Sequence, residues 1–177
     1  MKIVCDSSAL IVLARIGRLD ILEKMVKALL IPQAVYEDIV VKGASRAGEI
    51  EVRKAKWIEK RNVSNRELVR KLNVSLGLGE SEAIALAKEI KADLIILDDQ
   101  KARKAAISEG LRVAGLLALL IQAKEKGIIK RVRPIIDELK HKGFFISKDL
   151  YQDTIKKLEN RHYGHYLIFI PFTYPPY

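Results

Sequence analysis

The chain has 177 residues, of which 49% are hydrophobic and 31% are charged, which is enough for one well-packed domain and short for two. Thirty-two Lys and Arg against 22 Asp and Glu give a net charge of +10, so a polyanionic partner such as nucleic acid is favoured over a surface that is merely kept soluble. The single cysteine, Cys5, excludes an internal disulfide and a cysteine-rich metal knuckle, and it favours a reducing compartment.

The sequence shows no pattern typical of membrane targeting. The first residues lack a basic leader followed by a long apolar core, so we expect no signal peptide. The longest apolar window, Val113 to Ile121, is interrupted by Gly115 and is shorter than the ~20 apolar residues that span a bilayer. We therefore expect a soluble, cytoplasmic protein, and the abundance of Lys, Arg and Glu suggests a thermophilic source.

The first segment is a short apolar run that stops at an acid. Residues 2–5 are predicted to form a strand covered on both faces, as in a parallel sheet flanked by helices, and Asp6 follows directly. A serine then suits the cap of a helix over about residues 7–16, and Gly17 suits its end. Asp6 is thus expected at the carboxyl end of a strand.

The next segments predict a helix, a strand and a second helix. Leu19, Leu22, Val26 and Leu29 recur at helical spacing, and residues 29–31 are predicted as a short strand. Pro32 then opens a helix, because its fixed φ suits the first turn. Glu37 and Asp38 lie on that helix beside its apolar residues.

Residues 41–73 are the most basic region of the chain. We predict two surface helices, over about residues 46–55 and 65–72, joined by an edge strand within 57–63. Such a charge run indicates either a solvated face or a rim that contacts phosphates. Its basic residues are Lys42, Arg46, Arg53, Lys54, Lys56, Lys60, Arg61, Arg66, Arg70 and Lys71.

A second apolar run stops at acids later in the chain. Residues 76–79 form a glycine-containing loop that matches neither the Walker nor the dinucleotide pattern, and a helix is predicted from Glu80 to about Lys91. The apolar run 94–97 follows, predicted as a strand, and it ends at Asp98 and Asp99. This strand-to-acid junction repeats the design seen at Asp6.

The remaining elements extend the alternation of strands and helices. We predict a helix ending at Gly110, a strand over 111–113, and helices over 116–126, 134–142 and beyond Ser147. Repeated alternation favours right-handed crossovers and a parallel sheet. The tail, residues 161–177, predicts a packing arm or dimer strap more than a metal site, although His162 and His165 have a ligand-like spacing.

The carboxylates at the two strand ends suggest a metal site. If the two strands are neighbours, Asp6 and Asp98 lie close together, and such like charges raise a pKa or recruit a cation. Taken alone, Asp6 or Glu80 is more typical of a helix cap or of a favourable charge at a helix start. Agreement between both strand ends, with Asp99 as a third charge, instead favours Mg²⁺ or Mn²⁺. Carboxylates on a basic protein point to metal-assisted attack of water on a phosphodiester.

Four acidic motifs stand in order along the chain: Asp6-Ser7-Ser8, Pro32 to Ile39, Gly79 to Ala87, and Leu97-Asp98-Asp99 followed by Arg103 and Ala106. Over about residues 1–125 these motifs resemble the PIN-domain family of metal-dependent ribonucleases. The resemblance implies a three-layer α/β/α fold with a central parallel sheet, with residues 1–130 as a nuclease domain and residues 131–177 as a C-terminal helical extension and tail packed on it.

The resemblance also implies which residues act. Asp6, Asp38, Glu80, Asp98 and Asp99 match the family's catalytic acids, and all of these except Asp38 are expected to hold Mg²⁺ or Mn²⁺, while Asp38 positions water. At the second motif the family usually has Glu directly before the aliphatic residue. This chain has Asp38 there, and Glu37 stands one residue earlier.

The function implied by the resemblance is endonucleolytic cleavage of single-stranded RNA, in some members as the toxin of a toxin–antitoxin pair. RNA, an antitoxin protein and a second copy of the chain are then the expected partners. A non-catalytic PIN-like module that binds RNA or protein is the main alternative. A receiver-type phosphorylation switch is disfavoured, because no phosphoacceptor Asp and late Lys stand at suitable places.

Overall fold

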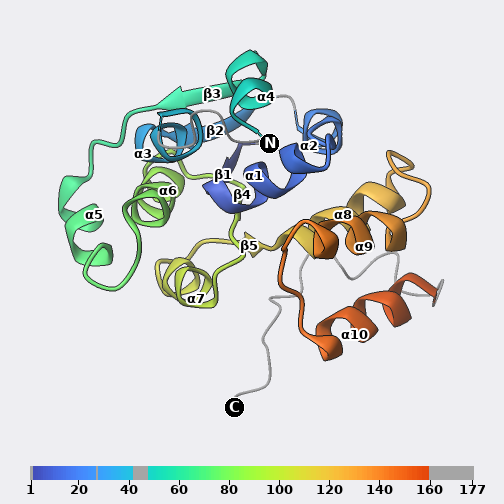
Figure 1. Cartoon of the computed structure of the whole chain (residues 1–177). Helices are drawn as coiled ribbons and strands as arrows, with labels where there is room; N and C mark the ends of the chain where they lie inside the picture. Colours follow the sequence, from blue (N-terminus) through green and yellow to red (C-terminus); the bar gives the residue numbers. More distant parts are fainter. Residues whose placement is uncertain (1, 27, 42–47, 160–177) are drawn as a thin grey trace.

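The computed structural model describes residues 2–26, 28–41 and 48–159, and its centre is a sheet of five parallel strands (Figure 1). Their order is β3-β2-β1-β4-β5, so β1 lies in the middle between β2 and β4. The strands are β1 (Ile3–Cys5), β2 (Leu29–Pro32), β3 (Ile58–Arg61), β4 (Leu94–Ile96) and β5 (Val113–Ala114). The fold is the three-layer α/β/α arrangement that the sequence predicts.

Helices cover both faces of the sheet, and each face has its own apolar cluster. One cluster takes Ile3 and Cys5 from β1, and the other takes Val4, because successive side chains of a strand point to opposite faces. The first cluster is covered by α1 (Ser7–Arg15), α2 (Asp20–Met25), α8 (Leu116–Glu125) and α9 (Arg133–His141). The second is covered by α5 (Arg66–Leu72), α6 (Leu78–Glu89) and α7 (Gln100–Ser108). Burial on both faces explains why the strands lack alternation.

Three further helices lie at the margins. Helix α3 (Gln33–Tyr36) continues directly into the π-helical turn η1 (Glu37–Val41), and α4 (Glu49–Lys54) precedes the edge strand β3. Helix α10 (Lys148–Glu159) lies beyond α9 in Figure 1. The predicted tail with His162 and His165 lies outside the described residues, as do Lys42 and Arg46. None of the described helices combines the length and the apolar character needed to cross a bilayer.

Three element boundaries differ from the prediction. Helix α2 ends at Met25 rather than continuing toward Leu29, which belongs to β2. Helix α6 begins at Leu78, two residues before the predicted start, because the Glu80 side chain accepts a hydrogen bond from the N–H of Gly77 and so caps the helix there. Strand β5 is Val113–Ala114 rather than 111–113, because pairing with Ile95 and Ile96 of β4 sets its position.

Candidate functional site

Asp6 and Asp98 are brought together by the pairing of β1 with β4. Cys5 stands opposite Ile96 in the parallel register, and the N–H of Asp6 donates to the carbonyl oxygen of Ile96 at 3.3 Å. Asp98 comes two residues after Ile96, so both carboxylates lie beyond the carboxyl ends of neighbouring strands. In open α/β sheets this edge is where ligands bind.

Each of these two carboxylates has one oxygen engaged and one without a partner. Asp6 Oδ1 accepts a hydrogen bond from the N–H of Ser8 at 3.2 Å, and Asp98 Oδ1 accepts one from the N–H of Leu116 at 2.9 Å. Both Oδ2 atoms are buried and have no hydrogen-bond partner among the described residues. A buried oxygen left without a partner is costly, so the pair has an unmet demand for a proton or a cation.

The pKa values of Asp6 and Asp98 reflect the same need for a proton or a cation. The pKa of Asp6 is raised to about 7, mainly by burial and also by the negative charges of Asp98 and Glu80, against hydrogen bonds from Ala9 and Ser8. Burial also raises the pKa of Asp98, although the N–H of Leu116 and the nearby Arg103 guanidinium oppose the change. Near neutral pH, a bound proton or a bound cation therefore stabilises Asp6.

Glu80 and Asp38 reach the same region from helices. Glu80 lies in the first turn of α6, where its Oε2 accepts a hydrogen bond from the N–H of Gly77 at 3.0 Å. Its negative charge is one of the causes that raise the pKa of Asp6, as expected for a carboxylate in the same region. Asp38 lies on η1 with its Oδ2 against Gly79, where an added methyl group would stand only 3.0 Å away. Gly79 thus allows the close approach of Asp38 to the start of α6.

Glu37, the neighbouring acid, is engaged elsewhere. The side-chain amide of Gln33 donates to Glu37 Oε1 at 2.9 Å, one helical turn away along the same segment. The contact with Gly79 belongs to Asp38 instead. A π-helical turn carries both acids, and such turns often occur at functional sites.

Asp99 occupies the first position of α7 as its cap. Its Oδ1 accepts a hydrogen bond from the N–H of Ala102 at 2.9 Å, and its side chain is exposed rather than buried. One oxygen is therefore used to satisfy a helix terminus. The second oxygen lies at the surface of the acidic edge, which is the edge of the sheet that carries Asp6, Asp98 and Asp99 with Asp38 and Glu80 beside them.

The predicted ligand set is not assembled as a complete cage. Within residues 2–26, 28–41 and 48–159, no group of three or more His, Cys, Asp or Glu side chains is arranged to hold a metal ion. Asp6 and Asp98 are close, whereas Glu80 and Asp99 each use one oxygen for a helix start. The Oδ2 atoms of the buried pair nevertheless fit a hard divalent cation, for which carboxylate oxygens and water are usual ligands.

Glu82 is a buried acid to which the sequence analysis assigned no role. Only 6% of its surface is exposed, and its Oε2 accepts a hydrogen bond from the N–H of Ala34 at 3.1 Å. Its Oε1 accepts one from Arg66 at 2.8 Å. Glu82 therefore ties the start of α3 to α6 and holds the segment that carries Asp38. A helix acid two residues after Glu80, directly before the apolar run 83–87, was the available signal.

Gly115 was also missed as part of the site. An added methyl group there would stand 2.7 Å from the Arg103 guanidinium and 3.1 Å from Asp98 Oδ1. Arg103 donates to the carbonyl oxygen of Leu97 at 3.1 Å, which places its positive charge beside Asp98. Because Gly115 has no side chain, the Arg103 guanidinium and the start of α8 can both approach the Asp98 carboxylate. Its only signal in the sequence was that it interrupts an apolar window.

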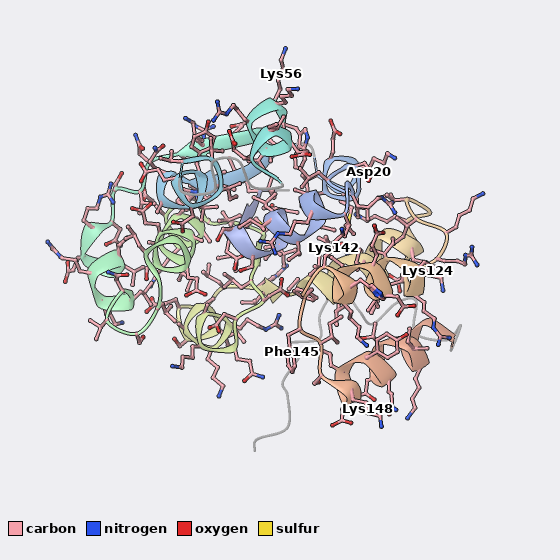
Figure 2. All side chains as sticks on the ribbon, in the orientation of Figure 1. Asp20, Lys56, Lys124, Lys142, Phe145 and Lys148 are labelled. Carbon is pink, nitrogen blue, oxygen red and sulfur yellow. The ribbon has the colours of Figure 1, made fainter. Side chains whose placement is uncertain are left out.

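Four of the eight described basic residues in the basic region over residues 41–73 form ion pairs with acids. Lys60 lies over the ring of Tyr36 at 4.1 Å, whereas Lys56 projects away from the surface in Figure 2. The ion pairs in this region are Arg53–Glu49, Arg61–Glu59, Arg66–Glu82 and Lys71–Glu109. The structure therefore supports a solvated, internally paired face for much of this region.

Comparison with known families identifies one match. The model of a family described as a PIN domain matches residues 2–160, which includes the sheet, the acidic edge and helices α9 and α10. No curated protein matches the chain.

Proposed function

The chain belongs to the PIN-domain family, whose fold is nuclease-like, and we propose that it is a Mg²⁺- or Mn²⁺-dependent endoribonuclease that cleaves single-stranded RNA. The observation that carries this proposal is the pair of buried Oδ2 atoms, one on Asp6 and one on Asp98, that have no partner among the described residues. Two such oxygens at adjacent strand ends are well suited to a divalent cation and poorly suited to an empty apolar core.

The roles proposed for the residues follow from their positions. Asp6 and Asp98 would hold the ion through the two Oδ2 atoms. Glu80 and Asp99 would add ligands through the carboxylate oxygens that do not accept the capping hydrogen bonds. A bound ion of this kind lowers the pKa of a water molecule and stabilises charge that develops on a phosphate. Asp38, held against Gly79, would orient water at the start of α6.

The surrounding chain preorganises these acids. The N–H groups of Ser8 and Leu116 fix one oxygen of each buried carboxylate and thereby orient the other. Arg103 offsets negative charge beside Asp98 and is available to a phosphate group. Glu82 holds the segment that carries Asp38. Fixed groups need little reorganisation during reaction, which is how such sites gain rate.

Two partners belong to the finer form of the proposal. If the protein is the toxin of a toxin–antitoxin pair, an antitoxin protein would cover the acidic edge and block access of RNA. A homodimer would bring two such edges into one assembly. The net charge of +10 supports attraction of RNA in either case.

Cleavage of a fluorescent single-stranded RNA tests the proposal directly. We expect activity with Mn²⁺ and none with EDTA, and we expect Asp98→Asn to lower the rate by at least roughly 100-fold, the scale of losing one preorganised electrostatic group. Glu67→Gln, which changes an exposed acid in the first turn of α5, serves as a matched control. Equal activity of the native protein and Asp98→Asn would overturn the catalytic proposal in favour of a binding module.

A further inference from the structure

A cleft of about 530 Å³ opens directly beside the acidic edge. It lies between α7 and residues 143–147, which join α9 to α10, and the start of α8 forms part of its wall. Asp98 and Asp99 stand at its edge, so the cleft is continuous with the proposed catalytic site. A volume of this size falls within the range of small-molecule sites in proteins.

The two walls of the cleft differ in chemistry. Helix α7 contributes two cations, Lys101 and Arg103, in its first turns. The segment across from it contributes two aromatic rings, Phe144 and Phe145. Cations suit phosphate oxygens, and aromatic rings suit the flat faces of nucleobases.

Phe145 lines the cleft from a segment that its two neighbours anchor to the apolar core. Phe144 packs against the apolar cluster that contains α9, and Ile146 is buried in that cluster. Phe145, between them, is 87% exposed. Figure 2 shows it on the segment between α9 and α10, and it lines the same cleft as α7.

The backbone on both sides of Phe145 is also fixed. Gly143, with a φ of +89°, ends α9, and the N–H of Phe144 donates to the carbonyl oxygen of Leu139 at 2.9 Å. Ser147 then accepts a hydrogen bond from the N–H of Leu150 and caps α10. Because the backbone beside it is fixed, no loop has to become ordered before a ligand stacks on the Phe145 ring.

We propose that this cleft holds one unpaired nucleotide of the RNA, with its base stacked on Phe145 and its phosphate between Lys101, Arg103 and the acidic edge. The inference rests on the proposed function, and it adds a recognition subsite formed by the C-terminal helices. Because an aromatic ring stacks on every base, the cleft selects unpaired RNA rather than a base sequence. Duplex RNA keeps its bases stacked on one another and cannot enter.

Binding of RNA in EDTA tests the subsite without any cleavage. We expect Phe145→Ala to weaken binding of a fluorescein-labelled single-stranded RNA by roughly tenfold, as expected for losing one stacked base, and Phe145→Trp to keep or improve it. Val74→Ala, which removes an equally exposed apolar side chain outside the cleft, should leave affinity unchanged. Thermal melting confirms that each variant is folded.

An RNA that lacks one base locates the contact. Replacing the nucleotides of a short RNA by abasic sites in turn should reveal one position whose loss weakens binding to the native protein. At that position the losses of binding free energy caused by the abasic RNA and by Phe145→Ala should not add, because each change removes the same stacking contact.

Three outcomes would overturn the subsite. They are unchanged affinity of Phe145→Ala, additive losses at every abasic position, and equal affinity for duplex and single-stranded RNA. Unchanged RNA affinity together with loss of a dimer in Phe145→Ala would assign the cleft to protein contact instead. Failure of cleavage alone, with base-dependent binding retained, would count against the proposed nuclease function and leave the subsite standing.

Discussion

The acidic edge and the cleft beside it are formed by different parts of the chain. At the edge, Asp6 is 1% exposed, and backbone pairing between two central strands sets its distance from Asp98. In the cleft, Phe145 is 87% exposed, and it belongs to a short segment between two outer helices. The edge carries acids of which Asp6 is fully buried, whereas the cleft is open and partly aromatic.

In the proposed nuclease, this difference would separate chemistry from recognition. Charges in a buried, preorganised setting act strongly on a reacting group, so the edge would govern the rate of cleavage. An exposed ring and surface cations mainly add affinity, so the cleft would govern how tightly RNA binds. Changes at the edge should therefore lower kcat, and changes in the cleft should raise KM.

The strongest test of the edge is binding of Mn²⁺. We expect the double variant Asp6→Asn, Asp98→Asn to lose Mn²⁺ affinity by more than about 100-fold, since loss of a group outside the ligand shell already costs roughly 10- to 100-fold. Isothermal titration calorimetry measures this loss, with Glu67→Gln as the control. Equal Mn²⁺ binding by the native protein and the double variant would place the ion elsewhere.

The pH dependence of stability tests the same edge without metal. In the folded protein the pKa of Asp6 is raised from 3.8 to about 7, so the folded state binds more protons than the unfolded state between those values. Stability should therefore fall as pH rises through this window, by on the order of 4 kcal/mol for Asp6. Thermal melting in EDTA from pH 4 to pH 8 measures the fall.

Asp6→Asn sharpens this measurement. The variant removes the charge, so its melting temperature should change less over the same range and should exceed that of the native protein at pH 8. Added Mn²⁺ should raise the melting temperature of the native protein at pH 8, because it binds the folded state preferentially. A native protein whose stability rises steadily from pH 4 to pH 8 in EDTA would contradict the assignment.

The two glycines that cap α8 and α6 offer a matched comparison. Gly115→Ala places a methyl group 2.7 Å from Arg103 and 3.1 Å from Asp98, whereas Gly77→Ala meets only Glu80 at 3.6 Å. Neither position has a positive φ, so alanine fits both backbones. We expect about a tenfold loss of kcat for Gly115→Ala, since small misplacements of catalytic groups are costly, and little change for Gly77→Ala. Equal kcat values for Gly115→Ala and Gly77→Ala would show that cleavage does not depend on the exact positions of Arg103 and Asp98.

The smallest effect is expected in the basic region far from the cleft. Replacing Lys54, Lys56 and Lys60 by Ala should weaken RNA binding only about threefold and flatten its salt dependence by at most about two units of slope, since single strands give roughly 0.7 per phosphate contact. Fluorescence anisotropy at several salt concentrations measures both quantities. A larger loss than that of Phe145→Ala would place the main RNA path across β3 instead.

Much of the fold and part of the site follow from local features of the chain. The apolar runs before Asp6 and Asp98 predict buried parallel strands, because such runs suit burial on both faces. The alternation of these runs with amphipathic helices predicts the three-layer α/β/α fold. Short elements such as α4 were harder to place, because six residues give too little periodicity to fix helix ends.

Only the tertiary structure decides which distant residues meet. The adjacency of β1 and β4 joins residues more than 90 positions apart, and it depends on how the whole chain packs. The same holds for the contact of Asp38 with Gly79 and for the position of Gly115 beside Asp98. Local sequence determines the strands and the acids that follow them, because backbone preferences act over a few residues. Packing of complete elements decides which of those acids share a site.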